Sequence, residues 1–175
     1  TSMSAGSRRG AMMATVRCDH PDVEAFIEAK KDPARLRMFN LSVLITDDFM
    51  AAVKADGPWD LKFAGKIWRT LQARDLWKTI MQSTFDYAEP GVIFIDRMNK
   101  ANNLSYCETI AATNPCGEQP LPPYGACLLG SINMPTLVTG AFTDAAVLDL
   151  AALDDLVRMA VRMMDNVVDA SRFTL

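Results

Sequence analysis

Asn114, Cys116 and Glu118 bring an amide, a thiol and a carboxylate together in the stretch Asn-Pro-Cys-Gly-Glu, and Cys127 follows eleven residues after Cys116. If this stretch is extended, alternate side chains point the same way, so the three groups would share one face. The carboxylate can act as a base, the amide can hydrogen-bond a hydroxyl, and the thiol can carry a covalent or a radical step. The residue types therefore predict an active site around Cys116.

The surroundings of Cys116 favour radical chemistry over nucleophilic chemistry. A neighbouring carboxylate disfavours the thiolate that a nucleophile needs, but it does not hinder the loss of a hydrogen atom. The single histidine, His20, stands far away in the sequence, so a cysteine hydrolase is disfavoured. Pro115 fixes the backbone before the thiol and Gly117 permits a tight bend after it, which together favour a short, rigid loop.

The remaining cysteines point to no separate site. The spacing of Cys107, Cys116 and Cys127 does not match the paired Cys-x-x-Cys ligands of common zinc sites, so the sequence predicts no metal site. We expect Cys18 and Cys107 to be buried structural thiols.

Composition indicates a globular chain. The 175 residues are half apolar and 22% charged, and the formal net charge of −3 gives no footprint for DNA or for an anionic membrane. No apolar run approaches the roughly 20 residues that a spanning helix needs, and no signal peptide is visible. The sparse, unevenly spaced cysteines favour a cytoplasmic chain with reduced thiols. The chain ends lead us to expect a piece of a larger protein.

Hydrophobic patterning predicts the elements that must position the cysteines. Strands alternate with helices, which predicts an α/β fold, and about four strands are too few to close a barrel alone. The segment 106–133 is expected to be rich in loops. We expect helices over 19–31, 46–55, 70–88, 96–103 and 144–170, and strands over 38–45, 59–63, 92–95 and 126–132.

The cysteine-containing stretch also resembles a known family. Residues 114–127 and 129–133 are similar to the large, catalytic chain of ribonucleotide reductases, and most similar to its adenosylcobalamin-dependent (class II) branch. Further matching segments are residues 7–13, 18–22, 37–43, 89–96 and 165–167. The resemblance covers nearly the whole chain. It implies that residues 1–175 are part of the family's ten-stranded α/β barrel, the catalytic domain, with a finger loop at about 112–128.

The resemblance implies a role for each residue of the candidate site. Cys116 corresponds to the thiyl radical that removes the 3′ hydrogen of the ribose, and Glu118 to the carboxylate that takes the 3′-OH proton. Asn114 corresponds to the amide that hydrogen-bonds the substrate hydroxyls. Cys127 corresponds to one member of the redox pair that reduces the 2′ position and becomes a disulfide, its partner lying before this segment.

The resemblance also implies ligands and partners. Arg8, Arg9, Gly10 and Ala11 correspond to the loop that links a specificity-effector site to the substrate base. The implied cofactor is adenosylcobalamin, bound largely outside this segment. The implied partners are a ribonucleotide substrate, deoxynucleotide or ATP effectors, a thioredoxin-type reductant and a second copy of the complete chain, with no DNA and no membrane.

Two alternative readings stay open at this point. One is the oxygen-dependent branch of the same family, which takes its radical from a diiron partner chain. The other is an inactive fragment or a nucleotide-binding structural module. The sequence does not distinguish diphosphate from triphosphate substrates.

Overall fold

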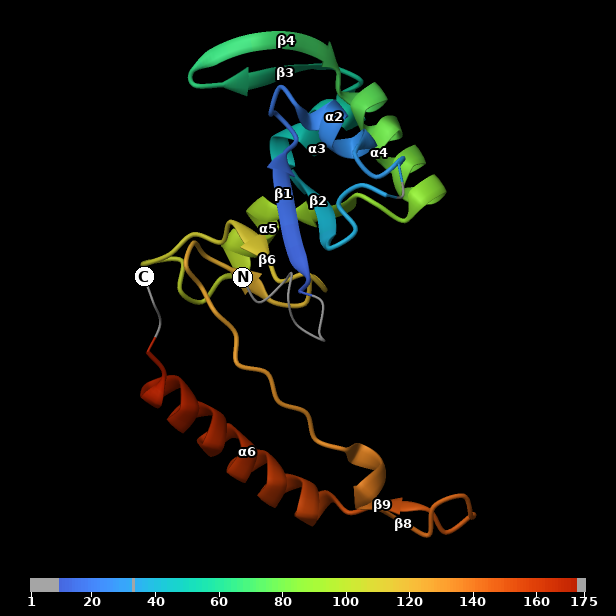
Figure 1. Ribbon diagram of the computed structural model, residues 1–175, viewed down its shortest axis with the longest axis vertical. Coiled ribbons are helices and arrows are strands. Elements are labelled where there is room, and N and C mark those ends of the chain that lie inside the picture. The colour runs from blue at the N-terminus through green and yellow to red at the C-terminus, as the bar shows by residue number, and fades with distance from the viewer. Residues whose placement is uncertain (1–9, 33, 173–175) are drawn as a thin grey trace. The chain divides into compact units, whose positions relative to one another are not determined.

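A computed structural model describes residues 10–32 and 34–172, and the chain divides into two compact units, Thr1–Gly125 and Ala126–Leu175 (Figure 1). Each unit is described by itself. The arginines Arg8 and Arg9 of the predicted effector loop lie outside the described residues. In the part of the chain that is described, no helix is long and apolar enough to cross a membrane.

The first unit is built on a parallel sheet of three strands in the order β1-β2-β5. The central strand β2 lies within the strand expected over 38–45, and its last five residues are buried, as is typical of a strand covered on both faces. Parallel strands need crossover connections, which here are helical. The strands are β1 (Met12–Arg17), β2 (Phe39–Ile45) and β5 (Gly91–Phe94), and the crossovers contain α2 (Val23–Glu28), α3 (Asp47–Ala55) and α4 (Ala73–Tyr87).

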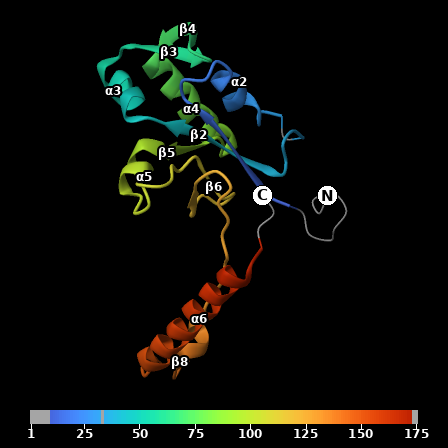
Figure 2. The ribbon, with the colours of Figure 1, turned by 90° about the vertical axis from the view of Figure 1, so that its left-hand side faces the viewer.

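Helices cover one face of this sheet and enclose the main hydrophobic core (Figures 1 and 2). Phe49 is fully buried there and meets Trp59 edge to face, with ring centroids 5.1 Å apart. Thr46 caps α3, because its hydroxyl accepts the Phe49 amide at 3.2 Å. The buried members of this core are Cys18, Val23, Ile27, Val43, Ile45, Phe49, Val53, Leu61, Ala73, Leu76 and Ile80.

The opposite face of the sheet carries a smaller cluster. Side chains alternate along a strand, so Leu44 points away from the core that its neighbours Val43 and Ile45 enter. Leu44 packs there with three residues from β5, from α5 (Ile95–Ala101) and from the segment that follows α5. These three are Ile93, Ile95 and Ile110.

An antiparallel hairpin precedes α4 and was only half predicted. Strand β3 (Pro58–Phe63) matches the expectation, whereas β4 (Lys66–Gln72) occupies residues where the sequence predicted the start of a helix. The helix begins instead at Ala73. The two strands are joined at Ala64 and Gly65, which both have positive φ, as tight hairpin turns require. Most β4 side chains are exposed, so burial periodicity gave no signal for it.

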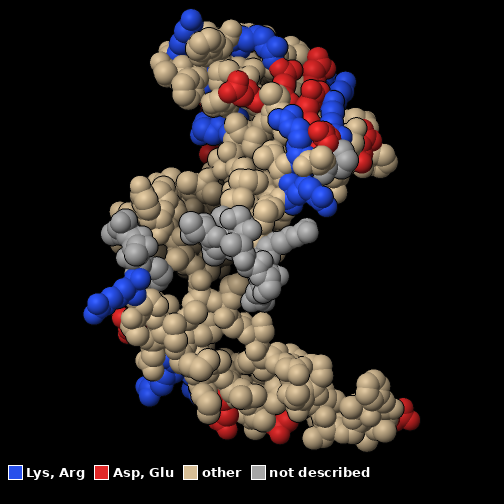
Figure 3. Space-filling view, in the orientation of Figure 1, with Lys and Arg blue, Asp and Glu red and all other residues tan. Residues whose placement is uncertain are grey.

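The second unit has few buried side chains. It contains η1 (Met134–Leu137), the short pair β8 (Val138–Thr139) and β9 (Val147–Leu148), and the long helix α6 (Leu150–Ala170). The strand expected over 126–132 is absent from the described structure, and the final helix begins at Leu150, where the Asp149 side chain caps it. No α6 side chain is buried, and the face of this unit seen in Figure 3 is mostly uncharged.

The fold-class expectation is therefore confirmed at the level of a mixed α/β segment. Three parallel strands with helical crossovers are present, and the described residues do not close a barrel. An open sheet is what a segment with few strands must form, because closure needs more strands than this chain supplies.

Candidate active site: the cysteine hairpin

Cys116 lies in a short hairpin, which we call the cysteine hairpin (residues 112–121). Strand β6 (Ala112–Thr113) pairs antiparallel with β7 (Pro120–Leu121), and the Asn114 amide donates to the Gln119 carbonyl at 3.1 Å. The backbone then turns sharply, because the Gly117 amide donates to the Asn114 carbonyl at 3.0 Å. The hairpin therefore presents the thiol on a tight turn.

This turn corrects the extended geometry expected from the sequence. Pro115 and Cys116 occupy the two central turn positions, for which the fixed φ of proline is well suited at the first. Gly117 follows with φ of +84°, a conformation that side chains with a Cβ rarely adopt. Alternate residues of a turn do not share a face, so the expected reason for convergence of the three groups was wrong.

The amide and the carboxylate nevertheless meet, by folding around the turn. Asn114 Nδ2 donates to Glu118 Oε1 at 2.5 Å, and Asn114 Oδ1 accepts the Gln119 amide at 3.0 Å. Cys116 lies between them in sequence with an exposed thiol, and within the described residues its Sγ forms neither a hydrogen bond nor a disulfide. A paired base and amide thus flank a free thiol on one rigid turn.

A small open cavity of about 440 Å³ adjoins the turn of residues 114–117, which we call the thiol turn. Its lining includes Cys116 together with polar side chains from β2 and from the loop before β5, namely Asn40, Ser42 and Glu89. Gly91 makes room for the Ser42 hydroxyl, since a Cβ at Gly91 would lie 2.9 Å from Ser42 Oγ. The thiol therefore borders a space with hydroxyl, amide and carboxylate groups around it.

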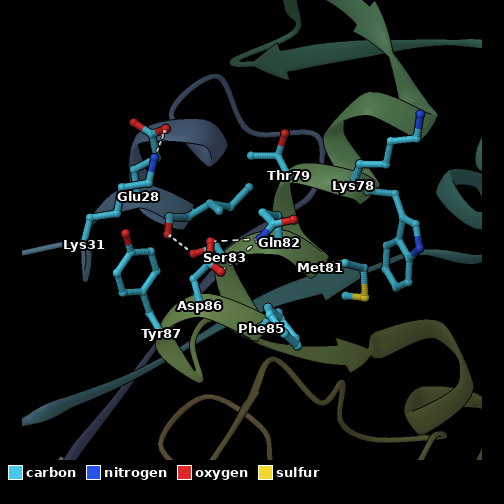
Figure 4. A pocket seen from close by; sticks show the side chains of 12 residues that line it. Glu28, Lys31, Lys78, Thr79, Met81, Gln82, Ser83, Phe85, Asp86 and Tyr87 are labelled. Atoms are coloured by element: carbon cyan, nitrogen blue, oxygen red, sulfur yellow. Dashed lines mark hydrogen bonds and ion pairs between the residues drawn. The ribbon is translucent and has the colours of Figure 1, made fainter.

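A larger cavity in the described residues lies elsewhere, and its lining also includes hydroxyl, amide and carboxylate side chains. It measures about 880 Å³ and lies along α4 and α2, where Figure 4 shows the Tyr87 ring near Lys31, which forms an ion pair with Glu28. The Ser83 hydroxyl in its wall already donates to backbone carbonyls, and no thiol reaches it. Of the three residues that the sequence singles out, Cys116 lines the smaller cavity, whereas Asn114 and Glu118 are not among its lining residues.

Comparison with known proteins identifies the family of this chain. The family model described as "Ribonucleotide reductase, barrel domain" matches residues 1–175. The chain belongs to the ribonucleotide reductase barrel-domain family. It is 40% identical over 171 residues to the vitamin B12-dependent ribonucleoside-diphosphate reductase of Thermoplasma acidophilum, covering 96% of this chain and 22% of that protein. The enzyme of the same name from Mycobacterium tuberculosis is 41% identical, with 96% of this chain and 24% of that protein covered. The chain thus spans about a quarter or less of the length of these relatives.

The other predicted site residues, Cys127, Gly10 and Ala11, have no described contact with Cys116. Cys127 is the second residue of the second unit and its thiol is exposed, so its approach to Cys116 stays a prediction. Gly10 and Ala11 directly precede β1, whose Met13 is paired with Asn40 of β2. The described half of the predicted effector loop therefore leads into the strand beside the thiol cavity.

The two cysteines expected to be structural behave differently. Cys18 is fully buried in the main core, and burial raises the pKa of its thiol. Cys107 is exposed in a turn, where its Sγ lies 3.5 Å from the Leu104 carbonyl oxygen. The burial expectation is confirmed for Cys18 and wrong for Cys107.

Sequence reasoning missed the residues that hold the cysteine hairpin in place. Asn99 on α5 fixes the approach to the hairpin, because its side-chain amide donates to the Ile110 carbonyl at 3.0 Å and accepts the Ile110 amide at 2.8 Å. Asn40 on β2 donates from Nδ2 to the carbonyl oxygen of Pro115. The signals available for Asn40 were its polar side chain in a mostly apolar strand and its place in the segment 37–43 that resembles the family.

A half-buried ion pair also borders the site. Lys30 Nζ and Glu89 Oε2 lie 2.7 Å apart, with 18% and 19% of their side chains exposed. Glu89 Oε1 accepts the Leu41 amide at 3.3 Å, and Lys30 donates to the Phe39 carbonyl. The pair thus satisfies backbone groups at the start of β2, before the pairing with β5 begins at Ser42.

Proposed function

We propose that this chain supplies the catalytic hairpin of an adenosylcobalamin-dependent ribonucleotide reductase, with Cys116 as the thiyl radical. The observation that carries the proposal is the Asn114–Glu118 hydrogen bond across a turn that exposes Cys116. The names of the T. acidophilum and M. tuberculosis relatives support the vitamin B12-dependent branch and a diphosphate substrate.

The proposed reaction uses each group of the cysteine hairpin in turn. The Cys116 thiyl radical takes the 3′ hydrogen of the ribose, so that an S–H bond forms as the C3′–H bond breaks. Glu118 accepts the proton of the 3′ hydroxyl, while Asn114 hydrogen-bonds the sugar hydroxyls and orients the Glu118 carboxylate. The 2′ hydroxyl gains a proton from one thiol of the redox pair and leaves as water.

Reduction at the 2′ position is assigned to Cys127. Its thiol and that of a second cysteine outside this segment supply two electrons and two protons, and the two sulfurs are oxidised to a disulfide. Glu118 returns its proton to the 3′ oxygen, and the sugar radical recovers the 3′ hydrogen from Cys116, which regenerates the thiyl radical. A thioredoxin-type reductant would reopen the disulfide between turnovers.

The proposal places the site for the cobalt cofactor largely outside this segment. The exposed thiol of Cys116 fits the role of the group that the cofactor oxidises. Adenosylcobalamin, held by other parts of the complete protein, would supply the one-electron oxidation of that thiol.

The remaining partners follow from the same proposal. Deoxynucleotide or ATP effectors would act through the loop of Arg8, Arg9, Gly10 and Ala11, whose described end leads into β1 beside the cavity. The complete protein would work as a homodimer in the cytoplasm. A radical needs a site shielded from water, which the remainder of the barrel would provide because the hairpin alone is exposed.

The test uses a full-length chain that carries this segment. Cys116→Ser should abolish deoxynucleotide formation in the presence of adenosylcobalamin, while circular dichroism stays unchanged. Cys127→Ser should allow radical formation, seen by electron paramagnetic resonance, but stop repeated turnover with a dithiol reductant. Cys107→Ser, which removes another exposed thiol, is the matched control and should turn over normally. Undiminished turnover of Cys116→Ser would refute the proposal.

The same assay separates the alternatives. A member of the oxygen-dependent branch would need a diiron partner chain and oxygen, and would not respond to adenosylcobalamin. A nucleotide-binding module would bind ribonucleotides but form no product under either condition.

A further inference from the structure

The hydrogen bond from Asn40 to the thiol turn joins two segments that are far apart in the sequence. Asn40 and Pro115 are 75 residues apart, and the bond joins the central strand of the sheet to the turn that carries Cys116. Within the described residues, the other hydrogen bonds of residues 114–117 stay inside the cysteine hairpin. Asn40 is thus their one hydrogen-bonded link to the sheet in that part of the chain.

The Pro115 carbonyl is the right atom to hold if the thiol is to be aimed. This carbonyl and the Cys116 amide belong to one planar peptide unit, so fixing the carbonyl fixes the plane from which the Cys116 side chain departs. Proline has no N–H, so its carbonyl is the only backbone group at this residue that a neighbour can hold by a hydrogen bond.

Asn40 is itself held firmly on both edges of β2. On one edge it is in register with Met13 of β1. On the other edge, where β5 does not reach, Glu89 accepts the Leu41 amide and Lys30 donates to the Phe39 carbonyl. The backbone on either side of Asn40 is therefore anchored, which makes its side chain a fixed point for the turn.

We propose that Asn40 is a positioning residue that aims the Cys116 thiol by holding the Pro115 carbonyl. This inference rests on the proposed role of Cys116 as the reacting thiol. Transfer of a hydrogen atom requires near contact between sulfur and carbon, and displacement by about 1 Å can cost on the order of 100-fold in rate. Asn40 has no assigned contact with the substrate, so its loss should weaken the chemical step and not substrate binding.

The test compares Asn40→Asp and Asn40→Ala with Asn103→Ala in a full-length chain. Aspartate keeps the shape of Asn40 but places an acceptor against the carbonyl, whereas alanine removes the link. Both variants should lower kcat by roughly 10–100-fold with KM unchanged. Asn103, an exposed asparagine beyond α5, is the control and should keep the wild-type kcat.

A second measurement needs neither cofactor nor substrate. In both Asn40 variants, hydrogen–deuterium exchange should become faster at the Cys116 and Gly117 amides, with β2 and β5 unchanged. The alkylation rate of Cys116 by iodoacetamide should rise as well, because the turn is freed. These readouts report the position of the turn independently of turnover.

The outcomes separate this inference from the proposed function. If Cys116→Ser is inactive but Asn40→Asp keeps kcat within about twofold of wild type, the role of Asn40 is overturned and that of Cys116 stands. A loss carried by KM, or faster exchange throughout the sheet, would assign Asn40 to binding or to general stability and would also overturn it. An active Cys116→Ser would instead remove the proposed function on which the inference rests.

Discussion

The two faces of the three-stranded sheet are built on different principles. The helix-covered face holds eleven buried residues in one hydrophobic cluster, whereas the face toward the cysteine hairpin holds four. Along β2 the division alternates residue by residue, with Val43 and Ile45 in the larger cluster and Leu44 in the smaller one. One strand thus serves a face that holds the main hydrophobic core and a face that lies toward the turn carrying Cys116.

The difference lies in the kind of contact that each face uses. Apolar packing is non-directional and scales with buried area, so it stabilises without fixing a single atom. Hydrogen bonds such as those of Asn40 and Asn99 are directional and contribute only about 1 kcal/mol each, but they fix positions. We therefore expect the larger losses of stability on the helix-covered face and smaller ones near the hairpin, where substitutions also change the environment of the Cys116 thiol.

The largest expected effect lies in the centre of the helix-covered face. Phe49→Ala removes a fully buried ring that packs on Trp59, and should lower the free energy of unfolding by about 3–5 kcal/mol. Urea denaturation followed by tryptophan fluorescence measures this, since all three tryptophans lie in the first unit. Phe85→Ala, at a ring that is 87% exposed, is the control and should change stability by less than about 0.5 kcal/mol. Equal losses for both variants would contradict the placement of the core.

A smaller effect is expected on the hairpin side. Gly91→Ala would put a Cβ 2.9 Å from Ser42 Oγ, so we expect a loss of about 1–3 kcal/mol from overpacking. Adding Ser42→Ala removes the clashing oxygen and should restore most of that loss, because the nearest remaining Ser42 atom lies 4.0 Å away. A double-mutant cycle by urea denaturation measures the coupling between the two positions. Additive losses would show that the clash does not exist.

The cap of α3 gives a still smaller effect. Thr46→Ala removes the hydroxyl that accepts the Phe49 amide, and should cost about 1 kcal/mol. Thr46→Ser keeps the hydroxyl and should retain most of the stability. Thermal melts of the two variants provide the comparison, and equal melting temperatures would show that the hydroxyl cap does not stabilise α3.

The smallest effect is a pH dependence that belongs to the helix-covered face. Burial raises the pKa of the Cys18 thiol above its ordinary value of 9.0, so above that pH the unfolded chain loses a proton that the folded chain keeps. Stability from this group is thus complete below pH 9.0 and declines at higher pH. The stability advantage of the wild type over Cys18→Ala should shrink between about pH 8 and about pH 10. An advantage that stays constant would argue against desolvation of Cys18.

Sequence patterns predicted the elements whose burial follows a simple rule. Strand β2 lies within one residue of its expected bounds because both of its faces are covered, and α3 begins where Thr46 can cap it. Strand β4 was missed because it is stabilised by pairing with β3 and not by burial. The prediction of a strand over 126–132 was wrong. That segment is apolar, but it has no described strand to pair with, and apolar character alone does not make a sheet.

The sequence predicted the residue types of the candidate site but not the hydrogen bonds that hold them in place. Asn114, Cys116 and Glu118 are adjacent in the sequence, so local chemistry was enough to single them out. Asn114 and Glu118 meet because of a turn and not along an extended strand, and this turn depends on a backbone hydrogen bond that the sequence does not display. Asn40 supports the turn from 75 residues away, and a contact of that separation follows only from the folded topology.

The hydrogen bond between Asn114 and Glu118 has a consequence for which sugars the site retains. Under the proposed roles, an incoming ribose must separate this closed pair, and it repays the cost by offering two neighbouring hydroxyls in exchange. The deoxyribose product has only one of them, so the amide and the carboxylate gain more by closing on each other again. Reduction of the sugar would thereby weaken its own hold on the enzyme and favour its departure.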